Sequence, residues 1–164
     1  MVLINWISDS DPYLPAPSDF IEVNRADQEK SPLELRRLAR ARDENVRARV
    51  ASNPHTPDDV LDSFKDDTPF VRLYLLRNPN LGLEFIKKFI GDKDGMVRGQ
   101  AYNILLDKYK RGDIDLSGKE LYQVVSHLAP NEPNLTMAEL LEDIRDTRAY
   151  LLEKRNGHPE IPDL

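Results

Sequence analysis

Val46-Arg47-Ala48-Arg49-Val50-Ala51-Ser52-Asn53-Pro54 returns 25 positions later as Val71-Arg72-Leu73-Tyr74-Leu75-Leu76-Arg77-Asn78-Pro79. A looser third copy begins near Gly82 and carries Val97-Arg98 and, further on, Asn103. Units of this length cannot bury an apolar face alone and stack on their neighbours. The period therefore predicts an array of three helical repeats of about 25 residues over residues 31–112.

Each repeat is predicted to hold two short helices. Ser31-Pro32 followed by Glu34 has the order of an N-cap, a proline at the first helical position and an acid at the third, which predicts a capping box. Thr56-Pro57 followed by Asp59 repeats this order. The second helix of each copy is expected to open at a capping residue, namely Asp43, Thr68 or Asp94. In the first two copies it is expected to end at the Asn-Pro pair, because Asn tolerates the left-handed conformation that ends a helix.

The ends of the chain differ from the repeats in charge. Residues 1–30 carry a net charge of −4, residues 31–112 carry +4 and residues 113–164 carry −6. The N-terminal segment is rich in proline, which interrupts helix, so we expect it to be extended or partly disordered. Its apolar start at residues 2–7 is expected to dock on the first repeat.

The C-terminal segment, residues 113–164, is predicted to form two helices and a tail. The helices are expected at about 118–128 and 137–155, the second opening with a capping box of Thr136 and Glu139. The second helix of the third repeat is expected to run on to Gly112. Since a repeat array needs a cover for its open end, we interpret the two C-terminal helices as a cap.

The composition excludes several classes of protein. There is no cysteine, so disulfides, thiolate metal sites and a cysteine nucleophile are absent. The apolar fraction of 40% and the charged fraction of 32% are typical of a soluble domain. No stretch has the roughly 18 apolar residues of a membrane span, and no basic region opens the chain, so we expect neither a membrane partner nor a signal peptide. These features favour a cytoplasmic protein.

The pattern Ser-Pro-x-Glu-Leu, Asp-x-x-Val-Arg, Val-Ala-x-Asn-Pro resembles the bacterial variant leucine-rich repeat. The element Asp-x-x-Val-Arg, at residues 43–47 and 94–98, is also similar to HEAT repeats. The resemblance covers about residues 31–105 and implies an all-α fold, a short right-handed α-solenoid, without implying a particular reaction. Some members of the variant family carry an iron–sulfur cluster in a cysteine-rich segment, and this feature cannot be carried over. We therefore expect no cofactor.

One set of arginines recurs with the repeat. The set, with the cap acids beside it, is Asp43, Arg47, Arg72, Asp94 and Arg98. Such a stripe either faces a ligand or forms an Asp–Arg ladder that joins successive repeats. Because a charge pair with the period of the repeat is itself part of stacking, we favour the structural ladder.

A second set is concentrated in the first repeat, with Arg36, Arg37 and Arg40 beside its apolar stripe. These side chains either contact phosphates or an acidic partner, or are neutralised by the acidic N-terminal segment. The sequence leaves both alternatives open.

A third set forms one predicted row. Arg49, Tyr74 and Gln100 each lie three residues after the valine of a second helix, and Arg77 lies one turn after Tyr74. A cation, an aromatic ring and an amide are the mixture that anchors protein interfaces. Tyr74 is equally compatible with the core, since its helix is apolar nearly all round.

No catalytic constellation or metal site emerges from the sequence. Residues 113–118 begin like a calcium loop, but the twelfth position holds Val124 where a bidentate Glu is required. A turn with Asp115 or Ser117 capping the next helix is favoured there. The three histidines form no metal-spaced pair.

We therefore predict a non-enzymatic module that binds a protein partner, in a bacterial or phage-related setting. The first alternative is nucleic-acid binding of the kind seen in base-excision enzymes built on HEAT-like repeats. The arginines favour it, whereas the pI of about 5.1 and the single tryptophan oppose it. The second alternative is an inhibitor whose acidic C-terminal helices mimic nucleic acid. The sequence leaves the identity of the partner and the oligomeric state open.

Overall fold

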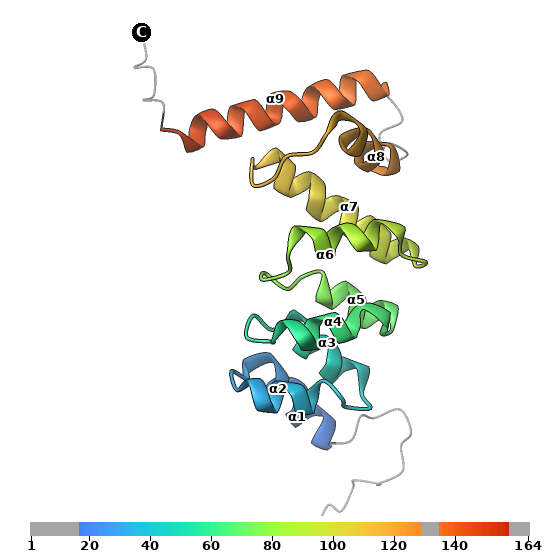
Figure 1. Cartoon of the computed structure of the whole chain (residues 1–164), viewed down its shortest axis with the longest axis vertical. Helices are drawn as coiled ribbons and strands as arrows, with labels where there is room; N and C mark the ends of the chain where they lie inside the picture. The colour runs from blue at the N-terminus through green and yellow to red at the C-terminus, as the bar shows by residue number, and fades with distance from the viewer. Residues whose placement is uncertain (1–16, 129–134, 158–164) are drawn as a thin grey trace, which may run out of the picture. The chain divides into compact units, whose positions relative to one another are not determined.

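The computed structural model describes residues 17–128 and 135–157 of the chain. Within these ranges it contains nine α-helices, two short 3-10 helices and no strand (Figure 1). The prediction of an all-α protein is confirmed. The chain divides into two compact units, with the boundary between Asn80 and Leu81. This boundary lies between the second and third copies of the repeat, and each unit is described by itself.

The first unit contains five α-helices and one 3-10 helix. They are α1 (Pro17–Gln28), α2 (Pro32–Leu38), α3 (Glu44–Ser52), α4 (Asp58–Ser63), η1 (Phe64–Asp66) and α5 (Pro69–Leu75). Helix α3 packs against both α1 and α5. The core is formed by buried apolar side chains, of which Val46 and Val50 recur 25 residues later as Val71 and Leu75, and it also contains Leu35, Leu38 and Phe64. Each predicted pair of helices in the first two repeats is therefore present.

Helix α1 corrects the expectation of an extended N-terminal segment. Pro17 is its first residue, a position where the fixed φ of proline suits the helix and its missing N–H is not needed. Ala26 is completely buried and lies 25 residues before the buried Ala51 of α3. Since α1 contacts α3 as α3 contacts α5, α1 takes the place of a second helix that precedes the first repeat. The predicted docking of residues 2–7 lies outside the described residues.

The capping predictions for the second helices are correct. The Asp43 carboxylate accepts a hydrogen bond from the Asn45 N–H (2.8 Å), and Asp94 accepts one from the Met96 N–H (2.9 Å). The Thr68 hydroxyl accepts from the amide three residues on. These side chains satisfy backbone donors that a helix N-terminus leaves without partners.

The capping boxes predicted for the first helices are wrong. The Ser31 side chain makes no capping hydrogen bond, and its backbone N–H donates to the Glu29 carboxylate at 2.9 Å. Glu34 forms ion pairs with Arg25 (3.1 Å) and Arg37 (2.8 Å). These charged partners keep the Glu34 carboxylate away from the helix start.

In the second repeat the corresponding cap is absent as well. The Thr56 hydroxyl is buried and donates to the Val50 carbonyl at the end of α3 (2.6 Å), while Pro57 occupies the N-cap position. Thr56 therefore ends the preceding helix and does not begin the following one.

The two Asn-Pro asparagines link neighbouring helices of the first unit. The Asn53 amide nitrogen donates to the carbonyls of Ala26 (2.8 Å) and Glu29 (2.9 Å), at and just beyond the end of α1. One repeat later, the Asn78 amide nitrogen donates to the carbonyls of Ala51 (2.9 Å) and Asn53 (2.8 Å), at the end of α3. Helix ends leave four carbonyls without intrahelical partners, and each asparagine supplies a donor to the helix before its own.

Both asparagine side chains also accept hydrogen bonds. The side-chain oxygen of Asn53 accepts from the His55 N–H (2.8 Å), and that of Asn78 accepts from the Asn80 N–H (2.9 Å). The left-handed conformation expected at these positions is wrong. Asn53 has φ −70° and ψ 127°, and no residue other than glycine has a positive φ among the described residues. We call the two buried side chains, Asn53 and Asn78, the asparagine ladder.

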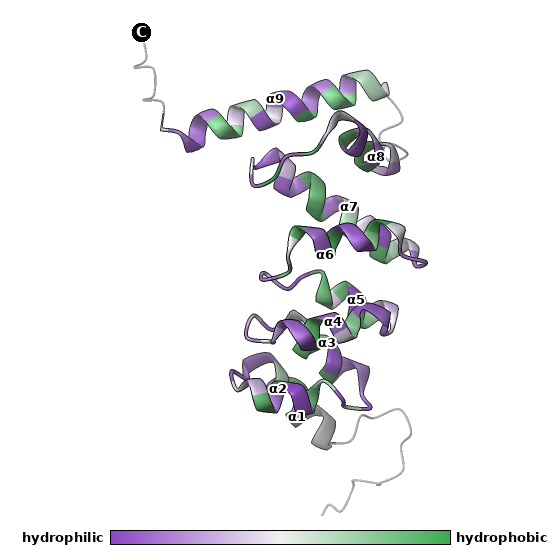
Figure 2. Cartoon of the chain, viewed as in Figure 1, coloured by the Kyte–Doolittle hydropathy of each residue, from purple (hydrophilic) through white to green (hydrophobic). Residues whose placement is uncertain are grey.

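The second unit holds the third repeat and the two C-terminal helices. Its elements are α6 (Leu83–Lys88), the 3-10 helix η2 (Phe89–Gly91), α7 (Gly95–Lys110), α8 (Gly118–Leu128) and α9 (Met137–Arg155). The helices predicted at 118–128 and 137–155 are confirmed, as is the capping box of Thr136 and Glu139. Along α9, hydrophobic and hydrophilic residues alternate (Figure 2). Its apolar face contributes the buried Ile144 to a cluster with Leu121 and Val125 of α8.

One arginine of α9 closes the end of α7. The Arg148 guanidinium donates to the carbonyls of Tyr109 and Ile114 (2.9 Å to the latter), and pairs with Asp115 at 2.5 Å. It also lies 4.3 Å from the centroid of the Tyr109 ring. Gly112, with φ 76°, supplies the left-handed conformation that ends α7 at the predicted place.

An ion pair joins α6 to α8. The Lys87 ammonium lies 3.0 Å from the Glu120 carboxylate, which also accepts hydrogen bonds from the backbone N–H and the hydroxyl of Ser117 (2.9 and 2.8 Å). Ser117 in turn caps α8 by accepting from the Glu120 N–H. The hydrogen bonds from Ser117, reinforced by Lys87, lower the pKa of Glu120 to about 2.

We expect Asn78→Ala to lower the free energy of unfolding by about 2–4 kcal/mol, because two carbonyls at the end of α3 lose a buried donor. Chemical denaturation followed by circular dichroism measures this change. The matched control is Asn24→Ala, since Asn24 is exposed on α1 and its loss should cost less than about 0.5 kcal/mol. Equal effects of the two substitutions would contradict a structural role for the asparagine ladder.

The lowered pKa of the Glu120 carboxyl leads us to expect that the stability of the fold depends on pH. Its pKa in the folded protein lies below the ordinary value of 4.5, so its contribution is present above that value and is lost as the pH falls toward about 2. We expect the wild type to have a higher thermal midpoint than Glu120→Gln near pH 7, and the difference to shrink as the pH falls from 4.5 toward 2. Glu142→Gln, which alters an exposed glutamate of α9, should show no such convergence. A pH-independent difference for Glu120→Gln would contradict the prediction.

Candidate binding surface

A group of side chains from α1, α3 and α5 meets on one face of the first unit. Tyr74 lies on α5, and Arg49 occupies the equivalent position of α3 one repeat earlier. Because α3 and α5 pack together, these positions are neighbours, and the Arg49 guanidinium lies 5.6 Å from the centroid of the Tyr74 ring. Arg77 covers the same ring at 4.8 Å. The Phe70 ring lies 4.9 Å from that of Tyr74 in a tilted arrangement.

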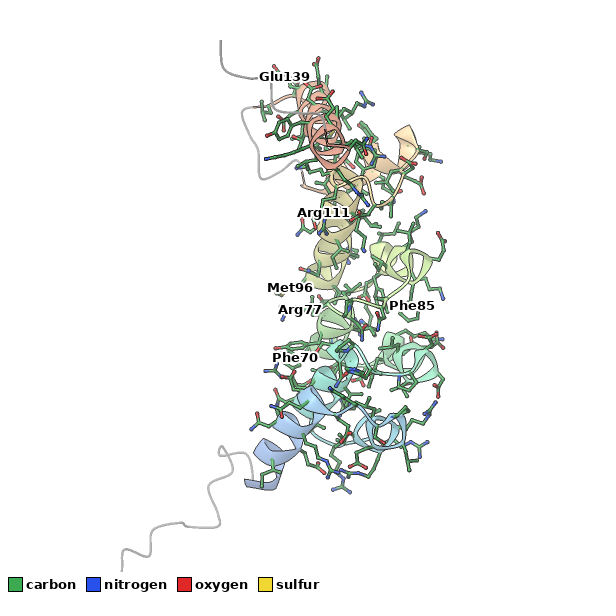
Figure 3. All side chains as sticks on the ribbon, turned by 90° about the vertical axis from the view of Figure 1, so that its left-hand side faces the viewer. Phe70, Arg77, Phe85, Met96, Arg111 and Glu139 are labelled. Atoms are coloured by element: carbon green, nitrogen blue, oxygen red, sulfur yellow. The ribbon has the colours of Figure 1, made fainter. Side chains whose placement is uncertain are left out.

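We define the Tyr74 cluster as these four residues together with Asp27 of α1. Its centre is half-buried and its edge is open. Tyr74 is partly accessible, Arg77 is exposed and Phe70 retains 36% of its accessible surface. Figure 3 shows Phe70 and Arg77 on the same side of α5. Tyr74 is therefore neither fully buried in the core nor fully exposed, and its ring packs on Phe70 within an accessible cation–aromatic surface.

The two guanidinium groups of the Tyr74 cluster differ in their partners. Arg49 forms a loose ion pair with Asp27 of α1 at 3.6 Å, and the two side chains are 42% and 57% exposed. Arg77 has no ion-pair partner among the described residues. A cation over an aromatic face gains about 0.5–1 kcal/mol at an exposed site. The rings thus hold both cations in place without neutralising Arg77.

The predicted arginine group of α2 is largely neutralised by the protein itself. Arg36 makes a bidentate pair with Asp59 (3.2 and 2.9 Å). Arg37 pairs with Glu34 (2.8 Å) and with Glu22 of α1 (3.2 Å), and the hydrogen bonds from Glu34 and Glu22 raise the pKa of Arg37.

Arg40 is exposed and has no ion pair within the described part of the chain. These contacts favour the alternative in which the protein's own carboxylates neutralise the arginines of the first repeat. The carboxylates come from α2 and α4 as well as from α1, and not from the N-terminal segment alone.

The arginines of the repeated Val-Arg pair bind backbone carbonyls before their own helices. Arg47 donates to the carbonyls of Ala41 and Arg42 (2.8 and 2.9 Å), Arg72 to that of Asp67, and Arg98 to that of Asp92 (2.6 Å). Arg72 is only 2% exposed. Through these contacts the three arginines hold the loops that precede α3, α5 and α7 against their own helices.

Arg47 also joins two repeats through Asp67, with both bonds of the bidentate pair at 2.9 Å. Burial raises the pKa of Asp67, but the hydrogen bonds from Arg47 and from the Thr68 N–H outweigh it and leave this pKa below its ordinary value. The sequence analysis placed Asp43 and Asp94 in this ladder, whereas in the structure both cap helices. Asp67 was missed, although it recurs 25 residues later as Asp92.

Gln100 lies half-buried on α7 in the second unit. Of the three residues in the predicted row, Arg49 and Tyr74 lie in the first unit, where the two side chains are in contact. The structure does not bring Arg36, Arg37 or Arg40 into the Tyr74 cluster by any described contact.

The described residues offer no group of three or more His, Asp or Glu side chains able to hold a metal ion. The failed calcium loop is a site of ion pairs, because Asp113 pairs with Arg155 (3.3 Å) and Asp115 with Arg148. None of the described helices is long and apolar enough to cross a membrane.

Comparison of the chain with protein-family models, with curated proteins and with solved structures gave no match. The observations above define an all-helical protein with an accessible cation–aromatic surface on its first unit.

We expect Tyr74→Ala to keep the helical circular dichroism signal, since the ring is only half-buried. A double-mutant cycle with Arg77→Ala should give a coupling energy of about 0.5–1 kcal/mol in the free energy of unfolding. The control cycle combines Tyr74→Ala with Arg36→Ala, whose side chain pairs with Asp59, and should be additive. Loss of the helical signal in Tyr74→Ala would place this ring in the core.

Proposed function

We propose that this protein is a non-enzymatic protein–protein interaction module, a short right-handed α-solenoid of repeats similar to variant leucine-rich and HEAT repeats. Helices α8 and α9 are its C-terminal cap, and the protein acts in the cytoplasm. The 25-residue spacing of the asparagine ladder supports the repeat assignment, because the same hydrogen bonds recur at the same positions of successive repeats.

The single observation that carries the proposal is the contact of the Tyr74 ring with both Arg49 and Arg77 on an open face. Tyrosine and arginine are the residue types that most often dominate binding energy at protein interfaces. A ring already held by two cations and by Phe70 loses little side-chain freedom on binding, so more of the contact energy is retained as affinity. Tyr74 is therefore the proposed anchor of the interface.

The ion pairs of the first unit weigh against nucleic-acid binding. A protein that tracks a phosphate backbone needs several unpaired cations in a row. Here Arg36, Arg37 and Arg47 are each paired with a carboxylate, so the arginine-rich composition of the first repeat does not produce a basic stripe. Binding of a protein partner requires no such stripe.

The test is affinity capture with the full chain from a lysate of the source cells, followed by quantitative mass spectrometry and titration of the purified partner. We expect Tyr74→Ala to weaken binding at least about tenfold, the effect of losing an interface hot spot. Tyr122→Ala is the matched control, because Tyr122 is exposed at 55% on α8 of the second unit. It should leave the affinity unchanged.

A partner that binds wild type and Tyr74→Ala equally well would remove the Tyr74 cluster as the interface. Turnover of an ester, a nucleotide or a nucleic acid by the purified protein, abolished by one polar substitution, would overturn the non-enzymatic assignment.

A further inference from the structure

The Tyr74 cluster contains a cation, Arg77, whose side chain forms no hydrogen bond with a described residue. Arg77 places its guanidinium over the Tyr74 ring at 4.8 Å, is exposed, and forms no ion pair with a described residue. The N–H groups of this guanidinium are therefore available for another acceptor. The planar acceptor that matches this fork of donors is a carboxylate. The ring beneath Arg77 restricts its motion before any ligand arrives.

Apolar surface adjoins this cation. Phe70 is 36% exposed and packs against Tyr74 in a tilted arrangement, with the ring centroids 4.9 Å apart. An acidic residue that reached Arg77 would bring its sequence neighbours onto these rings, where an apolar side chain gains by leaving water. The arrangement thus offers a charged contact and an apolar contact side by side.

We propose that the Tyr74 cluster recognises an acidic peptide segment of the protein partner, with a carboxylate of Asp or Glu bound by Arg77 and a neighbouring apolar side chain packed on Phe70 and Tyr74. This inference rests on the proposed function and specifies the chemistry of the partner. One carboxylate matches the guanidinium of Arg77, which is unpaired among the described residues, whereas a phosphate backbone would require the paired arginines of α2 as well.

Asp27 acts as an internal competitor at the same surface. Its carboxylate holds Arg49 at 3.6 Å, in a pair whose two side chains are both about half exposed. Exposed pairs of this kind contribute about 0–1 kcal/mol, so a carboxylate of the partner displaces Asp27 at small cost. Removal of the Asp27 charge therefore frees a second cation beside Tyr74 and strengthens the binding of acidic peptides.

The experiment is a selection of random peptides displayed on phage against the full chain. Four proteins are compared: the wild type, Tyr74→Ala, Arg77→Glu and Arg42→Glu. Arg42 is an exposed arginine before α3, so its substitution makes the same change of charge outside the Tyr74 cluster. We expect the wild type and Arg42→Glu to enrich peptides with Asp or Glu beside an apolar residue. Tyr74→Ala should lose this enrichment, and Arg77→Glu should replace it with Lys or Arg.

One enriched peptide is then labelled with fluorescein and titrated by anisotropy. Arg77→Glu should weaken its binding at least about tenfold, as expected when a charge-assisted contact becomes a repulsive one. Asp27→Asn should strengthen binding about 2–5-fold, the scale of an exposed ion pair. Circular dichroism checks the fold of each variant. Arg77→Gln, which keeps hydrogen-bonding capacity without the charge, replaces Arg77→Glu if that variant is unfolded, and should also weaken binding.

The outcomes separate this inference from the proposed function. Enriched peptides that depend on Tyr74 but carry no acidic residue would overturn the acidic partner and leave the interaction module standing. A complete lack of Tyr74-dependent peptides would overturn both. Labelled single-stranded or duplex oligonucleotides that bind more tightly than any peptide, and lose binding in Arg77→Glu, would replace the acidic peptide with nucleic acid.

Discussion

A buried carboxamide must satisfy two N–H donors and one carbonyl oxygen, and this requirement constrains how the helices of the first unit pack together. Asn53 and Asn78 meet it by donating to the end of the preceding second helix and by accepting from the backbone two residues on. The backbone carbonyl of Asn53 accepts a hydrogen bond from the Asn78 side chain. Each asparagine thereby fixes the register between two helices, and the same register brings Arg49 beside Tyr74.

Arginine serves two separate purposes in this protein. In the framework, Arg47, Arg72, Arg98 and Arg148 use their fork of donors on backbone carbonyls of loops and helix ends. On the surface, the arginines of α2 bind carboxylates of neighbouring helices. A count of basic residues therefore overstates the positive charge that the first repeat offers to a ligand. Arg77 differs from these arginines because it contacts the Tyr74 ring and forms no ion pair with a described residue.

Features with a local or periodic cause could be predicted from the sequence. The C-terminal helices followed from their caps and apolar spacing, with Thr136 and Glu139 forming the expected reciprocal pair. Helix α1 was missed because the prolines of the N-terminal segment were interpreted as breaks, whereas Pro17 stands at the first helical position, which favours proline. The capping box at Ser31 failed because Arg25 and Arg37 compete for Glu34, and the sequence around Ser31 does not reveal that α1 lies there.

The candidate surface was predictable in part, because some of its residues recur with the period of the repeat. The period placed Arg49 and Tyr74 in one row, since equivalent positions of stacked helices are neighbours. The contacts of Asp27 and Phe70 depend on the existence of α1 and on the rotation of α5, and neither follows from spacing alone. Similarly, the local sequence of the asparagines indicated only the end of a helix. Their bonds to the preceding helix could not be predicted, because the acceptors lie 24 to 27 residues away.

The asparagine ladder also restricts how such a chain changes in length during evolution. One inserted or deleted residue between Asn53 and Asn78 shifts a donor away from carbonyls that it reaches at 2.8–2.9 Å, and a buried polar group is left without a partner. Insertion of a whole repeat brings its own donor and its own acceptors, so equivalent bonds can form on both sides of the insertion. Gene duplication in steps of a full repeat is thus tolerated where smaller changes are not, and the number of repeats becomes the variable through which the length of this surface evolves.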